Sequence, residues 1–111
     1  MASNARNQIE SWLKTIDVKG SVIDFGGLFM PVKGRTKSWD VYEYSILDCK
    51  EERNGTRAQY VYDLNKMIPD KIKPFDVGFC IEVADHFWNP VFAFWNMANL
   101  LKVGGTLYVS A

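Results

Sequence analysis

Short apolar segments separated by polar turns run through most of the chain, and their spacing alternates between helical and strand periods. Apolar residues at helical spacing predict a helix over Asn4–Lys14. A second, largely buried helix is predicted over Val91–Leu101, beginning at Pro90 and ending at the glycines after Lys102. Runs of β-branched and aromatic residues predict strands at Ser21–Phe25, Trp39–Tyr44, Ala58–Tyr62, Phe75–Ile81 and Thr106–Ser110.

This order of elements predicts an α/β fold, because strands and helices alternate along the chain. Strands that are separated by crossovers form a mostly parallel sheet. The segment Phe75–Ile81 is almost continuously apolar, as expected of a strand that is covered on both faces. The length of 111 residues suits one compact domain, so residues 1–111 are predicted to form a single unit.

The stretch Ser21–Gly27 is the first candidate for a binding site. Its apolar run leads to Asp24, and Gly26 and Gly27 then allow a tight turn whose N–H groups can face an anion or a polar cofactor. The dinucleotide fingerprint G-x-G-x-x-G is incomplete, because Leu28 occupies the second glycine position. Taken alone, the stretch also fits an ordinary turn from a strand into a loop.

Acidic residues follow the other predicted strands. Glu43 is predicted to end the second strand, where a carboxylate can accept hydrogen bonds from ribose hydroxyls; a solvated strand-end carboxylate is the alternative. Asp63 and Glu82 follow the third and fourth strands. Because ligands of parallel sheets bind at the carboxyl ends of the strands, we expect these acids to converge on one site.

Charge and cysteine content narrow the classes of partner. Thirteen basic residues balance thirteen acidic ones, so nucleic acid binding is not expected. Cys49 and Cys80 form no disulfide framework, which fits a reducing, cytoplasmic compartment. The polar N-terminus resembles no signal peptide, and no apolar run approaches the length of a membrane span.

The second half of the chain carries the most specific motif. The run FDVGFCIEVADHFWNPVFAFWNMANLLKVGGTLYVSA resembles the class I S-adenosylmethionine-dependent methyltransferases, and most closely the type 11 methyltransferase-domain group. The similarity extends over Ser21–Ser110 and implies a Rossmann-like sheet with strand order 3-2-1-4-5. The last two strands of that family are missing, so the chain is either a fragment or a domain whose fifth-strand edge is covered by another chain or a second copy.

The resemblance implies S-adenosylmethionine as the cofactor, a small molecule as the methyl acceptor, and eight cofactor-binding residues. Three of them match the glycine motif that holds the methionine end: Asp24, Gly26 and Gly27. The other five match positions beside the ribose, the adenine and the sulfonium: Glu43 at the ribose hydroxyls, Tyr44, Asp63 and Leu64 at the adenine, and Glu82 near the sulfonium.

The catalytic residues stay open at this stage. His86 is the only histidine and is a candidate general base, with a structural imidazole at a helix start as the alternative. Glu82, Asp85 and His86 have the spacing of a possible metal site, although helix starts commonly hold acids because of the helix dipole. We expect no resident metal.

Two other functions remain open. A non-catalytic methyltransferase-like module that assembles with another chain would account for Leu28 and the missing strands. A nicotinamide-dinucleotide binder is disfavoured by the incomplete glycine fingerprint and by the run Leu100–Gly105.

Overall fold

The computed structural model describes residues 4–69 and 71–110 and has an α/β architecture. Its elements are α1 (Asn4–Leu13), β1 (Asp17–Phe25), β2 (Ser38–Asp48), β3 (Glu52–Arg53), β4 (Thr56–Arg57), β5 (Tyr60–Val61), β6 (Phe75–Ile81), a short 3-10 turn (Ala84–His86), α2 (Pro90–Asn99) and β7 (Leu101–Ser110). Neither α-helix in these residues is long and apolar enough to cross a membrane.

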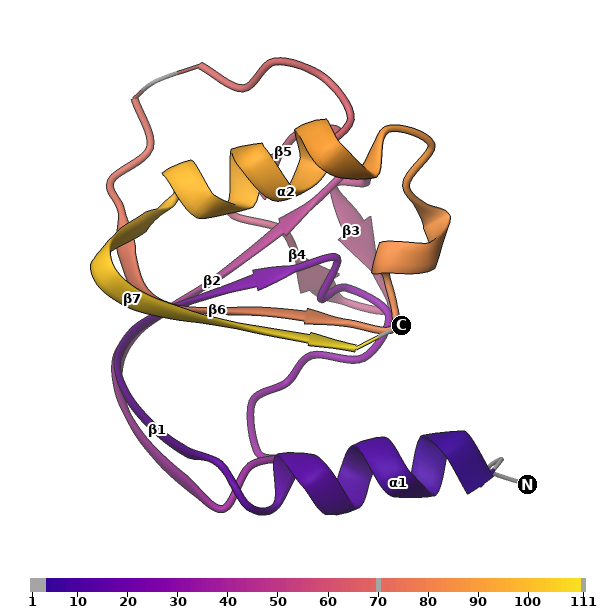
Figure 1. The fold of residues 1–111 in the computed structure, drawn as a ribbon, viewed down its shortest axis with the longest axis vertical. Coiled ribbons are helices and arrows are strands. Elements are labelled where there is room, and N and C mark those ends of the chain that lie inside the picture. The colour runs from indigo at the N-terminus through magenta and orange to yellow at the C-terminus, as the bar shows by residue number, and fades with distance from the viewer. Residues whose placement is uncertain (1–3, 70, 111) are drawn as a thin grey trace.

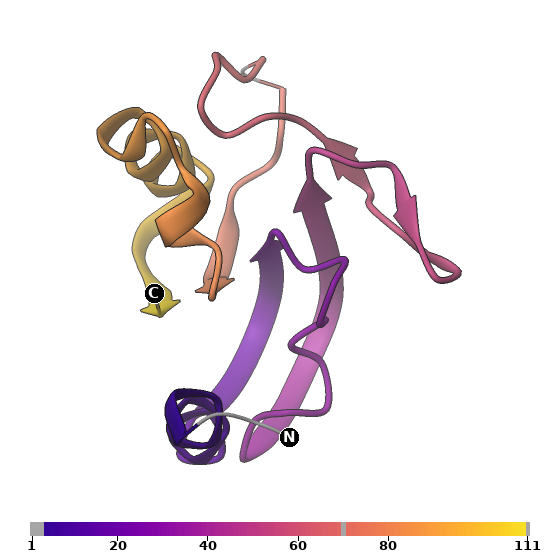
Figure 2. The ribbon, with the colours of Figure 1, turned by 90° about the vertical axis from the view of Figure 1, so that its right-hand side faces the viewer.

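Five strands form one parallel sheet in the order β5-β2-β1-β6-β7. Figure 1 shows α2 on one side of this sheet and α1 on the other, and Figure 2 shows the same layers from the side. The predicted α/β class and parallel sheet are therefore confirmed, and the architecture is compatible with a Rossmann-like fold. All carboxyl ends of the five strands lie along one edge of the sheet, because the strands are parallel.

The predicted strand order 3-2-1-4-5 is not matched. The third and fourth strands along the chain, β3 and β4, lie outside the large sheet and pair with each other in antiparallel fashion. They turn at Asn54 and Gly55, whose φ angles of 51° and 84° suit the tight mirror-image turn of a two-residue hairpin. Because this hairpin adds two strands between β2 and the next strand of the large sheet, the strand beside β2 is the fifth in the chain.

Several predicted boundaries differ from the structure, and three of the differences affect the site or the sheet. β1 begins at Asp17, four residues before the predicted start at Ser21. β2 does not end at Glu43 but continues to Asp48, because its pairing with β1 runs on to the Phe25–Leu47 pair. β7 begins at Leu101, so the glycine run that was predicted to end α2 lies in the irregular first half of a strand.

The core is divided by the sheet into two clusters. On one face, Leu13 of α1 packs with Val22 and Phe79, all of them fully buried. On the other face, Met97 of α2 packs with Ile23, and both are likewise fully buried. Successive residues of β1 point to opposite faces, so neighbouring apolar positions in one strand hold a helix on each side.

One buried polar side chain connects α2 to the segment that follows β5. Asn96 is 3% exposed, and its Nδ2 donates hydrogen bonds to the carbonyl oxygens of Leu64 (2.7 Å) and Lys66 (2.9 Å). Residues 64–66 are not paired with a strand, so the side-chain amide of Asn96 sets the distance between this segment and α2.

We expect Asn96→Ala to lower the free energy of unfolding by about 2 kcal/mol, because two carbonyl groups lose their buried donor. Asn99→Ala is the matched control on the same helix, since the amide of Asn99 is exposed and contacts only the carbonyl of Trp95. Urea denaturation should show a change below about 0.5 kcal/mol for the control. Equal losses in both variants would contradict the role given to Asn96.

Candidate functional site

Two adjoining cavities lie at the carboxyl ends of the parallel strands. The arginine cavity has a volume of about 450 Å³ and is lined by Arg6, Gly26, Phe29, Met30, Arg35, Ile81, Glu82, Val83, Asp85 and His86. The aspartate cavity has a volume of about 210 Å³ and is lined by Gly26, Leu47, Asp48, Cys49, Tyr62, Asp63, Leu64, Asn65, Val83, His86 and Phe87. Open parallel sheets bind their ligands at the carboxyl ends of the strands.

The turn at Gly26 belongs to both cavities. Gly26 has a φ of 73°, and its N–H donates to the carbonyl oxygen of Leu47 at 2.7 Å. A Cβ at this position would lie 2.7 Å from a methyl carbon of Val83. Only glycine fits here, because the backbone conformation is left-handed and the opposite wall is too close for a side chain.

A buried carboxylate holds this turn from below. Asp24 is 2% exposed and accepts hydrogen bonds from the backbone N–H of Val32 (2.8 Å) and the hydroxyl of Tyr44 (2.5 Å). Gly27 packs directly on it, since a Cβ there would lie 2.4 Å from the carboxyl carbon. Burial raises the pKa of Asp24 to about 6, and burial likewise raises the pKa of Tyr44. Asp24, Gly27 and Tyr44 therefore support the cavities from beneath and do not line them.

Asp48, which sequence reasoning missed, occupies the end of β2. Its Oδ2 accepts the N–H of Leu28 at 3.4 Å and its Oδ1 accepts the N–H of Lys50 at 3.1 Å. Glu43 lies in the middle of β2, and its carboxylate pairs with Lys73 at 3.1 Å. The signal that could have found Asp48 is the apolar pair Ile46–Leu47 before it, which repeats the apolar-then-acid pattern of the first strand.

Asp63 and Leu64 form the opposite wall of the aspartate cavity. Asp63 Oδ1 accepts hydrogen bonds from the backbone N–H and the side-chain amide of Asn65, each at 2.9 Å. The backbone bond from Asn65 is the main cause that lowers the pKa of Asp63, so this carboxylate is ionised at neutral pH. The pKa of the Cys49 thiol, in contrast, is raised by partial desolvation and by the neighbouring carboxylate of Asp48.

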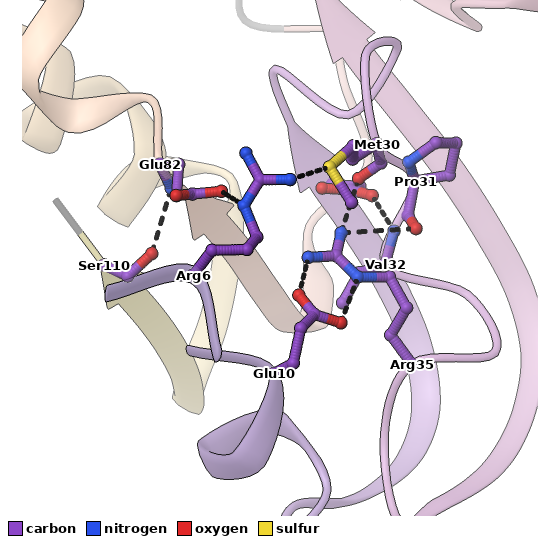
Figure 3. Close-up of polar contacts among 9 residues, drawn as sticks. Arg6, Glu10, Met30, Pro31, Val32, Arg35, Glu82 and Ser110 are labelled. Carbon is purple, nitrogen blue, oxygen red and sulfur yellow. Dashed lines mark hydrogen bonds and ion pairs between the residues drawn. The ribbon is translucent and has the colours of Figure 1, made fainter. Parts of the chain in front are cut away.

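Glu82 faces the arginine cavity from the end of β6. It has a φ of 58°, an uncommon conformation for a residue with a side chain, and its N–H donates to the carbonyl oxygen (3.1 Å) and the hydroxyl (2.9 Å) of Ser110. Its carboxylate pairs with Nε of Arg6 at 3.1 Å, and Nη1 of Arg6 also contacts the sulfur of Met30. Figure 3 shows these contacts reaching from α1 to the strand ends.

A second ion pair fixes α1 to the loop that follows β1. Glu10, one helical turn after Arg6, accepts hydrogen bonds from Nε (3.2 Å) and Nη2 (2.5 Å) of Arg35. Arg35 also donates to the carbonyl oxygen of Met30 at 2.8 Å (Figure 3). The hydrogen bonds from Arg35 lower the pKa of Glu10. The guanidinium of Arg35 thereby connects α1 to the loop that forms one wall of the arginine cavity.

The two cavities suit different chemical groups. The aspartate cavity combines the carboxylates of Asp48 and Asp63 with apolar walls, which suits an apolar ring system that carries hydroxyl or amino donors. The arginine cavity combines arginines with the carboxylates of Glu82 and Asp85, which suits a chemical group that carries both a negative and a positive charge. Within residues 4–69 and 71–110, no three His, Cys, Asp or Glu side chains are positioned to hold a metal ion.

The structure brings together some of the predicted residues and separates others. Gly26, Asp63 and Leu64 line the aspartate cavity, and Glu82 lines the arginine cavity beside Gly26. Further residues were missed because they come from segments with no strand-end signal, among them Arg6, Phe29, Met30 and Phe87. A scan against models of known protein families found no match, and a search of curated proteins found none either.

The buried carboxyl of Asp24 predicts an unusual dependence of stability on pH. Its folded-state pKa of about 6 exceeds its ordinary value of 3.8, so the folded protein binds more protons than the unfolded chain between these pH values. Stability must then fall as the pH rises through this window. We expect the wild type to lose about 2 kcal/mol between pH 4.5 and pH 7 relative to Asp24→Asn.

This prediction is checked by urea denaturation of both proteins across that range. The comparison with Asp24→Asn removes the contribution of the other carboxylates, such as Glu10 and Asp63, whose lowered pKa values act in the opposite direction at lower pH. A difference between the two proteins that stays constant with pH would contradict the raised pKa of Asp24.

Proposed function

We propose that this chain is an S-adenosylmethionine-binding domain of the class I methyltransferase type. In this proposal the adenosine occupies the aspartate cavity and the amino-acid end of the cofactor occupies the arginine cavity. The observation that carries it is that the two cavities meet at the Gly26 turn. The aspartate cavity also holds the carboxylates that follow the neighbouring strands β2 and β5. This pairing of a glycine turn with a carboxylate on the next strand suits a ribose-containing ligand.

The aspartate cavity offers a partner for each part of an adenosine. Asp48 would accept hydrogen bonds from the ribose hydroxyls, in the role that sequence reasoning gave to Glu43. Asp63 would accept a hydrogen bond from the adenine amino group. Leu64 and the aromatic rings of Tyr62 and Phe87 supply apolar walls for the base. Asp24, Gly27 and Tyr44 would act indirectly, by holding the turn in place.

The arginine cavity offers both charges that an amino-acid group needs. The guanidinium of Arg6 would face the carboxylate of the cofactor, and the carboxylate of Glu82 would face its ammonium or sulfonium group. Binding would thereby replace the ion pair between Arg6 and Glu82 with two ion pairs to the ligand. Arg6 and Glu82 would each keep an oppositely charged partner in this exchange, so neither would be left unpaired.

Methyl transfer requires little of the protein beyond alignment of the acceptor with the activated methyl group that the bound cofactor supplies. The arginine cavity extends towards Phe29 and Met30, and its volume of about 450 Å³ lies within the range of small-molecule sites. We therefore propose a small-molecule acceptor. The low cysteine content leads us to propose a cytoplasmic enzyme as well.

A second candidate is a methyltransferase-like module that assembles with another chain. The observation that favours it is the position of β7 at an edge of the sheet, where Val103 is fully exposed. Edge strands with exposed apolar side chains readily pair with further strands. Calorimetric titration with the cofactor and its demethylated product tests this candidate, since folded protein that binds neither would favour it.

We expect isothermal titration calorimetry to detect binding of S-adenosylmethionine and S-adenosylhomocysteine to the wild type. Asp48→Asn should weaken both by about 10- to 100-fold, because a charged acceptor of the ribose hydroxyls is lost. Glu43→Gln is the matched control, since the carboxylate of Glu43 pairs with Lys73 away from both cavities. It should change affinity by less than about threefold.

The pair of variants also decides which acid serves the ribose. Loss of binding in Glu43→Gln with retention in Asp48→Asn would overturn the assignment of the aspartate cavity. No binding by folded wild type to either ligand would overturn the proposed function itself.

A further inference from the structure

The two cavities have three lining residues in common: Gly26, Val83 and His86. Gly26 has no side chain and Val83 presents only methyl groups. His86 is therefore the single residue of this junction that can take up or release a proton, and it is the only histidine in the sequence.

His86 is accessible from the site. It ends the 3-10 turn that follows β6, with its backbone N–H bonded to the carbonyl oxygen of Val83 at 2.9 Å, and its side chain is 76% exposed. A side chain this exposed is not held by the packing of the core. The exposed ring at the junction of two cavities instead suits a group that meets a ligand.

Charged and titratable groups approach His86 from both cavities. The carboxylate of Asp85 is closest, with its Oδ1 3.9 Å from Nε2 of the imidazole. Arg6, Arg35 and Glu82 line the arginine side, and Asp48, Cys49 and Asp63 line the aspartate side. The carboxylate of Asp85 can stabilise the imidazolium that forms when the ring accepts a proton.

We infer that His86 is the general base that receives the proton of the methyl acceptor, an inference that rests on the proposed function. The sulfur joins the adenosine to the amino-acid end, so it and its methyl group would lie at the junction, beside His86. An acceptor hydroxyl or amine gives its proton to the imidazole as its oxygen or nitrogen bonds to the methyl carbon. The bond between the methyl carbon and the sulfur would break, and the sulfur would keep the two electrons of that bond as a neutral thioether.

This assignment limits the class of acceptor. A base at the junction serves an acceptor that carries a removable proton on oxygen or nitrogen, such as an alcohol, a phenol or an amine. A carboxylate or thiolate that is already ionised needs no such residue. The acceptor is therefore expected to be a small molecule whose reacting oxygen or nitrogen carries a proton.

The test uses nuclear magnetic resonance on the whole chain with S-adenosylmethionine labelled with ¹³C in its methyl group. A single histidine gives unambiguous imidazole signals. We expect nuclear Overhauser contacts between the labelled methyl protons and the imidazole C–H protons of His86.

His86→Gln is the control variant: the contacts of the methyl protons with the imidazole C–H protons should disappear, which assigns those signals to His86. Contacts of the methyl protons with Met30 or Arg6 in place of His86 would overturn the inference and leave the proposed function intact. Absence of any bound methyl signal would instead count against the proposed function.

Discussion

The buried carboxylate of Asp24 holds the turn on which both cavities depend. Its two hydrogen-bond donors come from different places, the backbone of Val32 in the loop and the hydroxyl of Tyr44 in β2. Gly27 packs against the same group, so the loop can approach β1 closely only where a side chain is missing. A carboxylate kept in such a place at the cost of a raised pKa indicates that the geometry of the turn matters more than the desolvation penalty.

The arginine cavity depends on α1, which is not part of the sheet. Arg6 and Glu10 lie one turn apart on this helix and reach opposite walls of the cavity, at Glu82 and Arg35. Such partly exposed ion pairs contribute little stability individually. The apolar side of α1, with Leu13 fully buried against the sheet, holds the helix in place, and the ion pairs set how it faces the cavity.

The sequence predicted elements well where one pattern dominates. β6 has the predicted bounds Phe75–Ile81, because a strand covered on both faces is almost continuously apolar. The end of β2 was misplaced, because aromatic and β-branched residues are concentrated in Trp39–Tyr44 and the buried continuation to Asp48 includes Ser45. The placement of Glu43 at the strand end followed from this error, and Asp48 was missed for the same reason.

The amino-acid order alone was sufficient for the α/β class, the glycine turn and the acids after β5 and β6, because these depend on local patterns of apolar residues, glycines and strand ends. Packing of the whole chain was needed to reveal that Asp24 and Tyr44 lie beneath the turn, and that Arg6 reaches Glu82. The first of these contacts joins residues 20 positions apart in the chain, and the second joins residues 76 positions apart. Local periodicity carries no information about such distances, because they are set by strand register and by which helix face packs on the sheet.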